Sequence, residues 1–133
     1  MEYKSNNNIV YSCNYVVVFC TKYRRKVLVG GVAERLKTLI PEICGSLDIE
    51  LLEMKINPEY VHLLLDVDPQ LGIHKAVKQI KGRTSHVLRD EYRQLTTKIP
   101  SLWTNSYFVS TVGSVPADVF MRYIESQKTS QRQ

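Results

Sequence analysis

The sequence has few cysteines and no long apolar run, and both absences narrow the class of protein. Its three cysteines, Cys13, Cys20 and Cys44, are odd in number and show no Cys-x-x-Cys spacing, which argues against a disulfide framework and a zinc knuckle. All three lie among apolar residues, so we expect buried thiols in a reducing compartment. The longest apolar run, residues 15–20, is too short to span a bilayer, and residues 1–8 are polar. We therefore expect a cytoplasmic protein with no membrane contact.

Low-complexity linkers and extreme charge are also missing. The chain has 133 residues, of which 44% are hydrophobic and 23% are charged, so it can form one domain with a core but not two. Its net charge of +5 favours an anionic partner without proving one. We expect a single domain over residues 1–133 with flexible ends at residues 1–8 and 128–133, and no small-molecule cofactor.

The apolar residues follow strand-like and helix-like spacings in turn. Residues 11–21 are rich in Val, Tyr and Phe and predict a strand buried on both faces. The other predicted elements are a helix at 32–47 with a kink or restart at Pro41, strands at 49–56 and 60–67, a helix at 73–95, a strand at 107–112 and a last helix after Pro116. This order predicts an α+β, ferredoxin-like (split β-α-β) fold: an antiparallel sheet with helices on one face, plus an extra C-terminal helix.

The extra helix carries a phenol and a carboxamide on one stripe. Tyr123 and Gln127 are four residues apart, so they share a helix face. Phe120, Met121 and Ile124 can supply the apolar contacts of this helix, which leaves the two polar side chains free. Most helix tyrosines only pack their rings, but a tyrosine phenolate can attack a phosphodiester and form a phosphotyrosine. Tyr123 is therefore the candidate nucleophile.

His62 lies in the middle of a predicted strand, on the same face as Tyr60. A lone strand histidine is commonly a core residue hydrogen-bonded to backbone, but an imidazole is also a metal ligand. Gln127 offers a carbonyl oxygen and Glu59 a carboxylate, both acceptable to Mg²⁺ or Mn²⁺. A neutral phenol is a poor ligand for these ions, so Tyr60 would stack on a base or fill space. The candidate metal ligands are thus His62 and Gln127, with Glu59 as a further one.

Two basic clusters are interleaved with aromatic and hydroxyl residues. They fit a phosphate backbone with stacked bases, and they fit a solvated polar face equally well. The candidate phosphate contacts are Lys22, Tyr23, Arg24, Arg25, Lys78, Lys81, Arg83 and Ser85. Gly82 lies between two of them in a predicted helix, where it would let backbone approach a phosphate. His74 and His86 are more than three helical turns apart, so they cannot share one ion, and we expect surface or capping positions for both.

These motifs together, in this order, resemble the TnpA-type single-tyrosine transposases of the HUH endonuclease superfamily, from the smallest bacterial and archaeal insertion sequences. The resemblance runs through residues 13–19, 22–25, 57–64, 80–85, Trp103, 107–113 and 122–127. It implies that Tyr123 forms a 5′-phosphotyrosine on single-stranded DNA with hairpin ends. It also implies that His62 and Gln127 help to bind Mg²⁺ or Mn²⁺. Finally, it implies an obligate homodimer in which the tyrosine helix of one subunit can serve the metal site of the other.

The sequence departs from the family at one position. The family motif is His-hydrophobic-His, and here Tyr60 stands where the first histidine would be, two residues before His62. Metal affinity would then fall, or another group would replace the imidazole, and Glu59 is the nearest. Two hypotheses stay open: a metal-dependent DNA strand transferase, and an inactive relic that still binds single-stranded or hairpin DNA. A ferredoxin-like RNA-recognition domain is less favoured, because no aromatic-rich strand pair is present.

Overall fold

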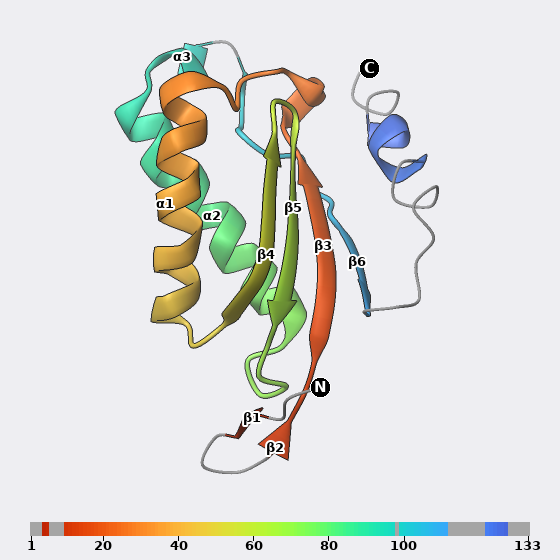
Figure 1. The fold of residues 1–133 in the computed structure, drawn as a ribbon. Coiled ribbons are helices and arrows are strands. Elements are labelled where there is room, and N and C mark those ends of the chain that lie inside the picture. Colours follow the sequence, from red (N-terminus) through yellow and green to blue (C-terminus); the bar gives the residue numbers. More distant parts are fainter. Residues whose placement is uncertain (1–3, 6–9, 98, 112–121, 128–133) are drawn as a thin grey trace.

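The computed structural model describes residues 4–5, 10–97, 99–111 and 122–127. Within them, one antiparallel sheet has the strand order β4-β5-β3-β6 (Figure 1). The strands are β3 Asn14–Cys20, β4 Glu50–Asn57, β5 Tyr60–Asp66 and β6 Phe108–Thr111. The first strand of this set lies between the third and the fourth, which is the order of a split β-α-β fold. The predicted α+β, ferredoxin-like class is confirmed.

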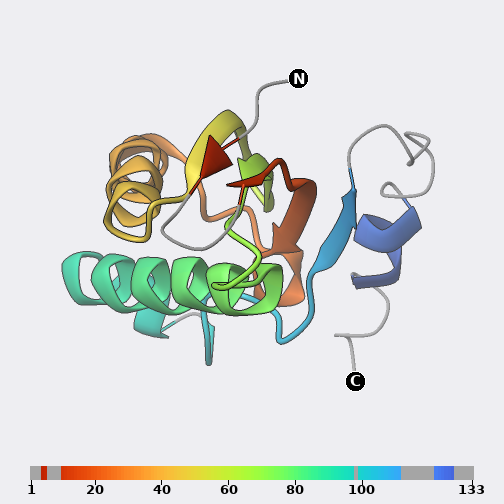
Figure 2. The ribbon, with the colours of Figure 1, turned by 90° about the horizontal axis from the view of Figure 1, so that it is seen from below.

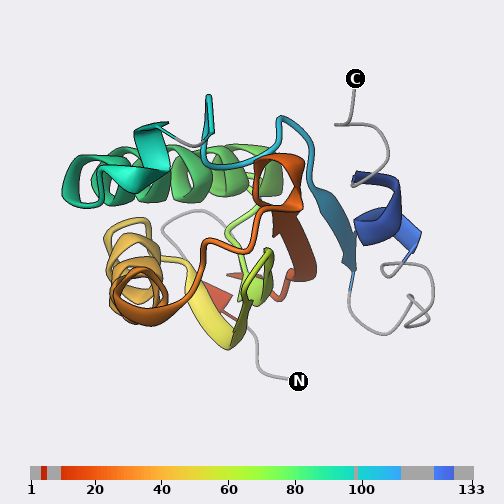
Figure 3. The same ribbon diagram turned by 90° about the horizontal axis from the view of Figure 1, so that it is seen from above.

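Two helices cover one face of the sheet. They are α1 Gly30–Ser46 and α2 Ile73–Glu91 (Figure 1). Residues 122–127 are helical and lie against the opposite face, as the two end-on views in Figures 2 and 3 agree. Residues 112–121 and 128–133, where the predicted last helix begins and the predicted tail lies, are outside the described residues. Both faces of the sheet are therefore covered at the central strand β3.

Strand β3 is buried on both faces, as predicted. Successive strand side chains point to opposite faces. Val17 and Phe19 lie in the core with α1 and α2, while Val18 and Cys20 lie in a second apolar cluster with Ile124. The four β3 side chains have no exposed area, and Ile124 is 1% exposed. An unbroken apolar run is what this doubly covered position requires.

The edge strand β4 contains an irregularity that explains its imperfect alternation. Its pairing with β5 changes register between Leu51 and Glu53, so Leu52 is the extra residue of a β-bulge. Leu52 is 44% exposed, whereas Leu51, Met54 and Ile56 pack against the core. The bulge brings residues of odd and even number to the same face.

Both helices differ in extent from the prediction. Helix α1 continues through Pro41, so no restart occurs there; Pro41 is exposed, where water can bond to the backbone carbonyl that its ring leaves unpaired. Helix α2 ends at Glu91, so the prediction of one helix to residue 95 was wrong. Tyr92 is extended, with φ −126° and ψ 97°, and its hydroxyl donates to the Gly31 carbonyl at 3.1 Å. A short helix α3, Gln94–Thr97, follows and buries Leu95.

Two short features lie outside the sheet and its helices. Strands β1 Lys4–Ser5 and β2 Val10–Tyr11 pair with each other, which no sequence signal predicted. A 3₁₀ turn, η1 Lys22–Arg24, follows β3 directly. Tyr23 and Arg24 in this turn have positive φ values of 60° and 51°, a region that residues other than glycine seldom adopt. The turn points the Arg24 side chain back over the end of the sheet.

The core should be far more sensitive to truncation than the bulge. Leu63 on β5 has no exposed area, so Leu63→Ala should lower the free energy of unfolding by about 2–5 kcal/mol. Leu52→Ala, the same change at the exposed bulge, should alter it by no more than about 0.5 kcal/mol. Urea unfolding followed by circular dichroism measures both. Equal losses in the two variants would contradict the assigned register.

Candidate functional site

Residues 122–127 cover the face of the sheet that carries His62. Ile124 anchors this segment, because it packs against Val18 and Cys20 in the second apolar cluster. Tyr60 and Tyr123 are partly buried against the same cluster. The predicted nucleophile and the predicted metal-binding strand therefore lie on one face of the sheet.

The structure brings Tyr123 and Gln127 together at one serine. The hydroxyl of Tyr123 is 3.0 Å from Ser106 Oγ, and Ser106 Oγ donates to Gln127 Oε1 at 2.8 Å. The ring of Tyr123 also packs on Phe108 of β6, with 5.8 Å between ring centroids. Burial raises the pKa of the Tyr123 phenol above its ordinary value. The phenol is therefore protonated at neutral pH in this arrangement.

His62 lies in a hollow of its own. The hollow has a volume of about 130 Å³ and is lined by Lys55, Asn57, Tyr60 and His62. Burial lowers the pKa of His62; Glu53 opposes this change and Lys55 adds to it. The imidazole is thus neutral at pH 7, the form in which histidine binds metal ions. Tyr60 occupies one wall of the hollow and packs its ring on the apolar cluster, so it fills space as expected.

The His62 hollow is lined by β4 and β5, whereas Tyr123 packs over β6. Val18 of β3 pairs with His62 of β5 on one side and with Phe108 of β6 on the other. Two steps between neighbouring strands put the Cα atoms of His62 and Phe108 about 10 Å apart. Tyr123 packs on Phe108, and neither it nor Gln127 lines the His62 hollow. The structure thus joins the predicted nucleophile and the glutamine through Ser106, while His62 faces a hollow that other residues line.

Glu59, the third candidate ligand, is held by Arg24. Arg24 Nη2 donates to Glu59 Oε1 at 2.7 Å. Its Nη1 donates to the Ile124 carbonyl at 3.3 Å and lies 3.5 Å from Glu125 Oε1. The guanidinium is only 11% exposed, so removing either carboxylate would leave a nearly buried charge less well paired. Arg24 thus joins the 3₁₀ turn to Glu59 and to residues 122–127, and its predicted contact with phosphate stays a prediction.

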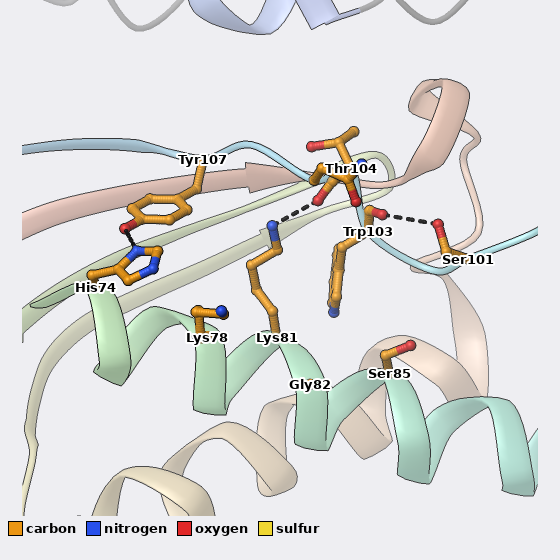
Figure 4. A pocket seen from close by; sticks show the side chains of 10 residues that line it. His74, Lys78, Lys81, Gly82, Ser85, Ser101, Trp103, Thr104 and Tyr107 are labelled. Carbon is orange, nitrogen blue, oxygen red and sulfur yellow. Dashed lines mark hydrogen bonds between the residues drawn. The ribbon is translucent and has the colours of Figure 1, made fainter.

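Lys81 holds the backbone that carries Ser106. Its Nζ donates to the Thr104 carbonyl at 2.6 Å and to the Ser106 carbonyl at 3.0 Å. Figure 4 shows the side chain reaching from α2 toward Thr104. Burial lowers the pKa of Lys81 to about 8. The amine uses two of its three hydrogens on backbone, so it positions a loop more than it presents a free charge.

A second hollow, of about 370 Å³, lies between α2 and residues 101–107 (Figure 4). Its lining residues are His74, Lys78, Lys81, Gly82, Ser85, Ser101, Trp103, Thr104, Asn105 and Tyr107. Gly82 faces open space, because a Cβ there would meet no atom within 4 Å. Of the predicted phosphate contacts, Lys78, Lys81 and Ser85 line this hollow.

The other predicted phosphate contacts lie elsewhere. Arg83 is exposed and donates to Ser46 Oγ at 2.7 Å. Lys22, Tyr23 and Arg25 belong to the 3₁₀ turn and the residue after it; Tyr23 is 42% exposed, and Lys22 Nζ lies 5.5 Å from its ring centroid. The basic residues therefore fall into two separate groups around the sheet.

Sequence reasoning missed Ser106 and the role of His74. Ser106 precedes β6 in a segment with no motif, and only the fold brings it to residues 122–127. His74 was expected at the surface; it is exposed, but its Nδ1 lies 2.7 Å from the Tyr107 hydroxyl and its ring stacks on Tyr107 (Figure 4). No local pattern couples α2 to residue 107, so neither contact had a sequence signal.

Three further predictions concern metal ions, thiols and membranes. Within the described residues, no group of three His, Cys, Asp or Glu side chains is placed to hold a metal ion. The predicted set with His62 and Gln127 is of another composition and stays a prediction. The three cysteines are free thiols. Cys20 and Cys44 are buried, as predicted, and burial raises the pKa of each to about 11. Cys13 is only partly buried, so the prediction of a buried thiol was wrong there. Among the helices that the structure describes, none is long and apolar enough to cross a membrane.

Known transposases match nearly the whole chain. A family model described as "Transposase IS200 like" matches residues 9–127. The ISDra2 transposase TnpA of Deinococcus radiodurans is 37% identical over 129 residues, which are 96% of this chain and 92% of that protein. The transposase for insertion sequence element IS200 of Salmonella typhimurium is 27% identical over 126 residues, which are 93% of this chain and 82% of that protein.

Two solved structures resemble the fold. A crystal structure of a candidate transposase from Deinococcus radiodurans R1 has a TM-score of 0.84 and 36% identity, and the match covers 93% of this chain and 97% of that one. A REP-associated tyrosine transposase bound to a REP hairpin has a TM-score of 0.59 and 13% identity, covering 96% of this chain and 74% of that one. The second likeness supports the fold alone.

The amine of Lys81 should titrate near pH 8 rather than at its ordinary 10.5, because burial disfavours its charged form. The folded chain binds this proton more weakly than the unfolded chain does. Lys81 therefore makes the free energy of unfolding rise as the pH increases from about 8 to 10.5. Carbon-13 NMR of labelled lysine Cε atoms, with the signal assigned by its loss in Lys81→Arg, measures the midpoint. A midpoint above 10 would contradict the buried position.

Proposed function

This chain belongs to the IS200-like transposase family, and we propose that it cleaves and rejoins single-stranded DNA at insertion-sequence ends through a covalent bond to Tyr123. The observation that supports this choice of nucleophile is the placement of Tyr123 and Gln127 around Ser106. If Tyr123 only packed its ring, its hydroxyl would not need to share the Ser106 hydroxyl with the carboxamide oxygen of Gln127.

The proposed reaction is a transesterification. The Tyr123 oxygen attacks a backbone phosphorus, the bond to the 3′ oxygen breaks, and a 5′-phosphotyrosine forms with release of a 3′-hydroxyl. The phenol loses its proton and the leaving oxygen gains one, so charge and atoms balance. Because the phosphotyrosine retains the energy of the broken ester, a second 3′-hydroxyl can reverse the step and rejoin a strand without ATP.

Metal assistance is part of the proposal. His62 would hold Mg²⁺ or Mn²⁺ through its neutral imidazole and Gln127 through its carbonyl oxygen. When bound, such an ion offsets the charge that develops on the phosphate oxygens. The two ligands would meet at one ion either within one chain or with a second copy of the chain contributing one of them. The proposed homodimer would allow the second case. Residues 122–127 can then serve the metal site of their own subunit (in cis) or that of the other subunit (in trans).

The DNA partner is proposed from the relatives and from charge. The structural neighbour with 13% identity is described as bound to a REP hairpin, and the present chain carries a net charge of +5. Lys78 and Ser85 at the larger hollow, together with exposed Arg83, offer contacts to a backbone. Lys22, Tyr23 and Arg25, in and after the 3₁₀ turn, offer further contacts and a stacking ring. Single-stranded DNA with hairpin ends fits these two groups.

A second candidate function rests on Tyr60. In this chain a phenol lines the His62 hollow where the family motif has an imidazole, and a neutral phenol is a weak ligand for a hard cation. The alternative is a catalytically weakened or inactive protein that binds hairpin DNA. It would bind DNA with a steep salt dependence and form no covalent product with any divalent ion.

Covalent capture decides between the two functions. The protein is incubated with single-stranded insertion-sequence ends labelled at their 3′ end, which stays with the 5′-phosphotyrosine, and Mn²⁺ or Mg²⁺, then run on a denaturing gel. We expect a labelled protein band that forms with the wild type and is lost in Tyr123→Phe. Tyr15→Phe, which removes the hydroxyl of a partly buried tyrosine that packs against the core from β3, serves as the matched control and should retain the band. An adduct that survives Tyr123→Phe would refute this nucleophile, and no adduct with wild type would favour the binding protein.

Restoring the family motif should strengthen metal use. Tyr60→His adds a second imidazole beside His62, and we expect the metal concentration for half-maximal nicking to fall by about tenfold, within the range of changes around metal ligands. Tyr60→Phe keeps the ring but adds no ligand, so it should leave that concentration unchanged. Nicking is measured against Mn²⁺ concentration for all three proteins. A Tyr60→His protein with the wild-type metal dependence would exclude a merely weakened site.

A further inference from the structure

The Ser106 hydroxyl lies between the proposed nucleophile and a proposed ligand, and its single hydrogen fixes the direction of both bonds. Ser106 Oγ donates that hydrogen to Gln127 Oε1 at 2.8 Å. The Tyr123 hydroxyl, 3.0 Å away, must then donate to Ser106 Oγ. In this arrangement the amide of Gln127 turns its oxygen, which accepts the hydrogen bond, toward the serine.

This geometry sets a spacing as well as an orientation. The Tyr123 oxygen and Gln127 Oε1 can lie no farther apart than the two hydrogen bonds placed end to end. A nucleophile and a metal-ligand oxygen that act on one phosphate need to be close neighbours of this kind.

Hydrogen bonds from α2 and from residue 104 hold the backbone of Ser106 in place. Its carbonyl accepts from Lys81 Nζ at 3.0 Å and from Thr104 Oγ1 at 3.1 Å. The Thr104 amide in turn donates to the Cys20 carbonyl at the end of β3. Helix α2 and the central strand therefore both determine where the Ser106 hydroxyl lies.

The segment of residues 122–127 has other anchors. Ile124 is buried in the second apolar cluster, and Arg24 donates to the Ile124 carbonyl and pairs with Glu125. These contacts hold the backbone of the segment to the sheet. Ser106 is an exposed residue. Its hydroxyl is therefore not needed to dock residues 122–127, and its hydrogen bonds orient the two side chains.

We propose that Ser106 is a positioning residue for the strand-transfer reaction: it holds the Tyr123 hydroxyl and the Gln127 carbonyl oxygen side by side, so that one segment presents nucleophile and metal ligand as a unit. This inference rests on the proposed function. It adds a residue, and a role for Lys81 as its support, to the candidate set.

Three variants test the kinetic side. Ser106→Ala removes the hydroxyl, Ser106→Thr keeps it, and Ser110→Ala removes the hydroxyl of a serine on β6 whose Oγ donates to the neighbouring Thr111 carbonyl. With labelled DNA in excess, we expect Ser106→Ala to slow adduct formation by roughly tenfold, the effect of losing two neutral hydrogen bonds, and to raise the Mn²⁺ concentration for half-maximal rate. DNA affinity should not change, Ser106→Thr should restore the rate, and Ser110→Ala should match the wild type.

NMR supplies a readout that needs no activity. We expect the side-chain amide signals of Gln127 and the ring signals of Tyr123 to shift together in Ser106→Ala and to return in Ser106→Thr, in protein without metal or DNA. If the wild type forms no adduct, the proposed function fails, and these shifts still show whether Ser106 holds the pair. An adduct rate and metal dependence unchanged by Ser106→Ala, or a faster rate, would overturn the positioning role. So would signals of the two side chains that do not respond.

Discussion

The complete burial of the central strand is the constraint on which the rest of the structure depends. Val17 and Phe19 require a cover on one face of β3, and helices α1 and α2 supply it; Val18 and Cys20 require a cover on the other, and Ile124 supplies it. A four-stranded sheet with two helices is complete as a fold without a second cover. The apolar second face therefore selects a position for residues 122–127, and that position brings Tyr123 over β6. The position of Tyr123, the proposed nucleophile, therefore follows from the packing of the isoleucine beside it.

A second layer of contacts converts this docking into an oriented site. Arg24 emerges from a turn with strained backbone and carries a nearly buried guanidinium that must find acceptors. It finds them in Glu59 at the β4–β5 loop and in Ile124 and Glu125 of the tyrosine segment. Lys81 acts similarly from the other side of the sheet, where burial lowers its pKa to about 8 and backbone carbonyls accept its hydrogens. Two cations that composition alone would assign to DNA thus stabilise the protein around Tyr123.

The sequence predicted those parts of the structure that depend on local pattern. The doubly buried β3, the antiparallel strand pair β4–β5 and the shared stripe of Tyr123 and Gln127 all follow from spacing, and the fold class followed with them. The family was predicted from the resemblance of several motifs in order. The side-chain contacts between residues far apart in the sequence could not be predicted from local spacing. Arg24 and Glu59 are 35 residues apart, and Ser106 and Tyr123 are 17 apart across a segment with no regular pattern. The bulge at Leu52 and the end of α2 at Glu91 were missed for a related reason: each depends on packing against another element, which propensity does not encode.

Tyr60 and Ser106 are connected through the chemistry of the proposed metal site. A site with two imidazoles has two neutral nitrogen ligands from one strand, both fixed by the sheet. With Tyr60 in the first position, the sheet supplies only His62, and the remaining affinity must come from oxygen ligands such as Gln127. An oxygen on a flexible side chain contributes only when its orientation is already set, since the entropy of fixing it is otherwise lost on binding. The hydrogen bond from Ser106 sets that orientation before any ion arrives. The loss of one imidazole therefore places more of the site's affinity on Gln127, and hence on the serine that directs it.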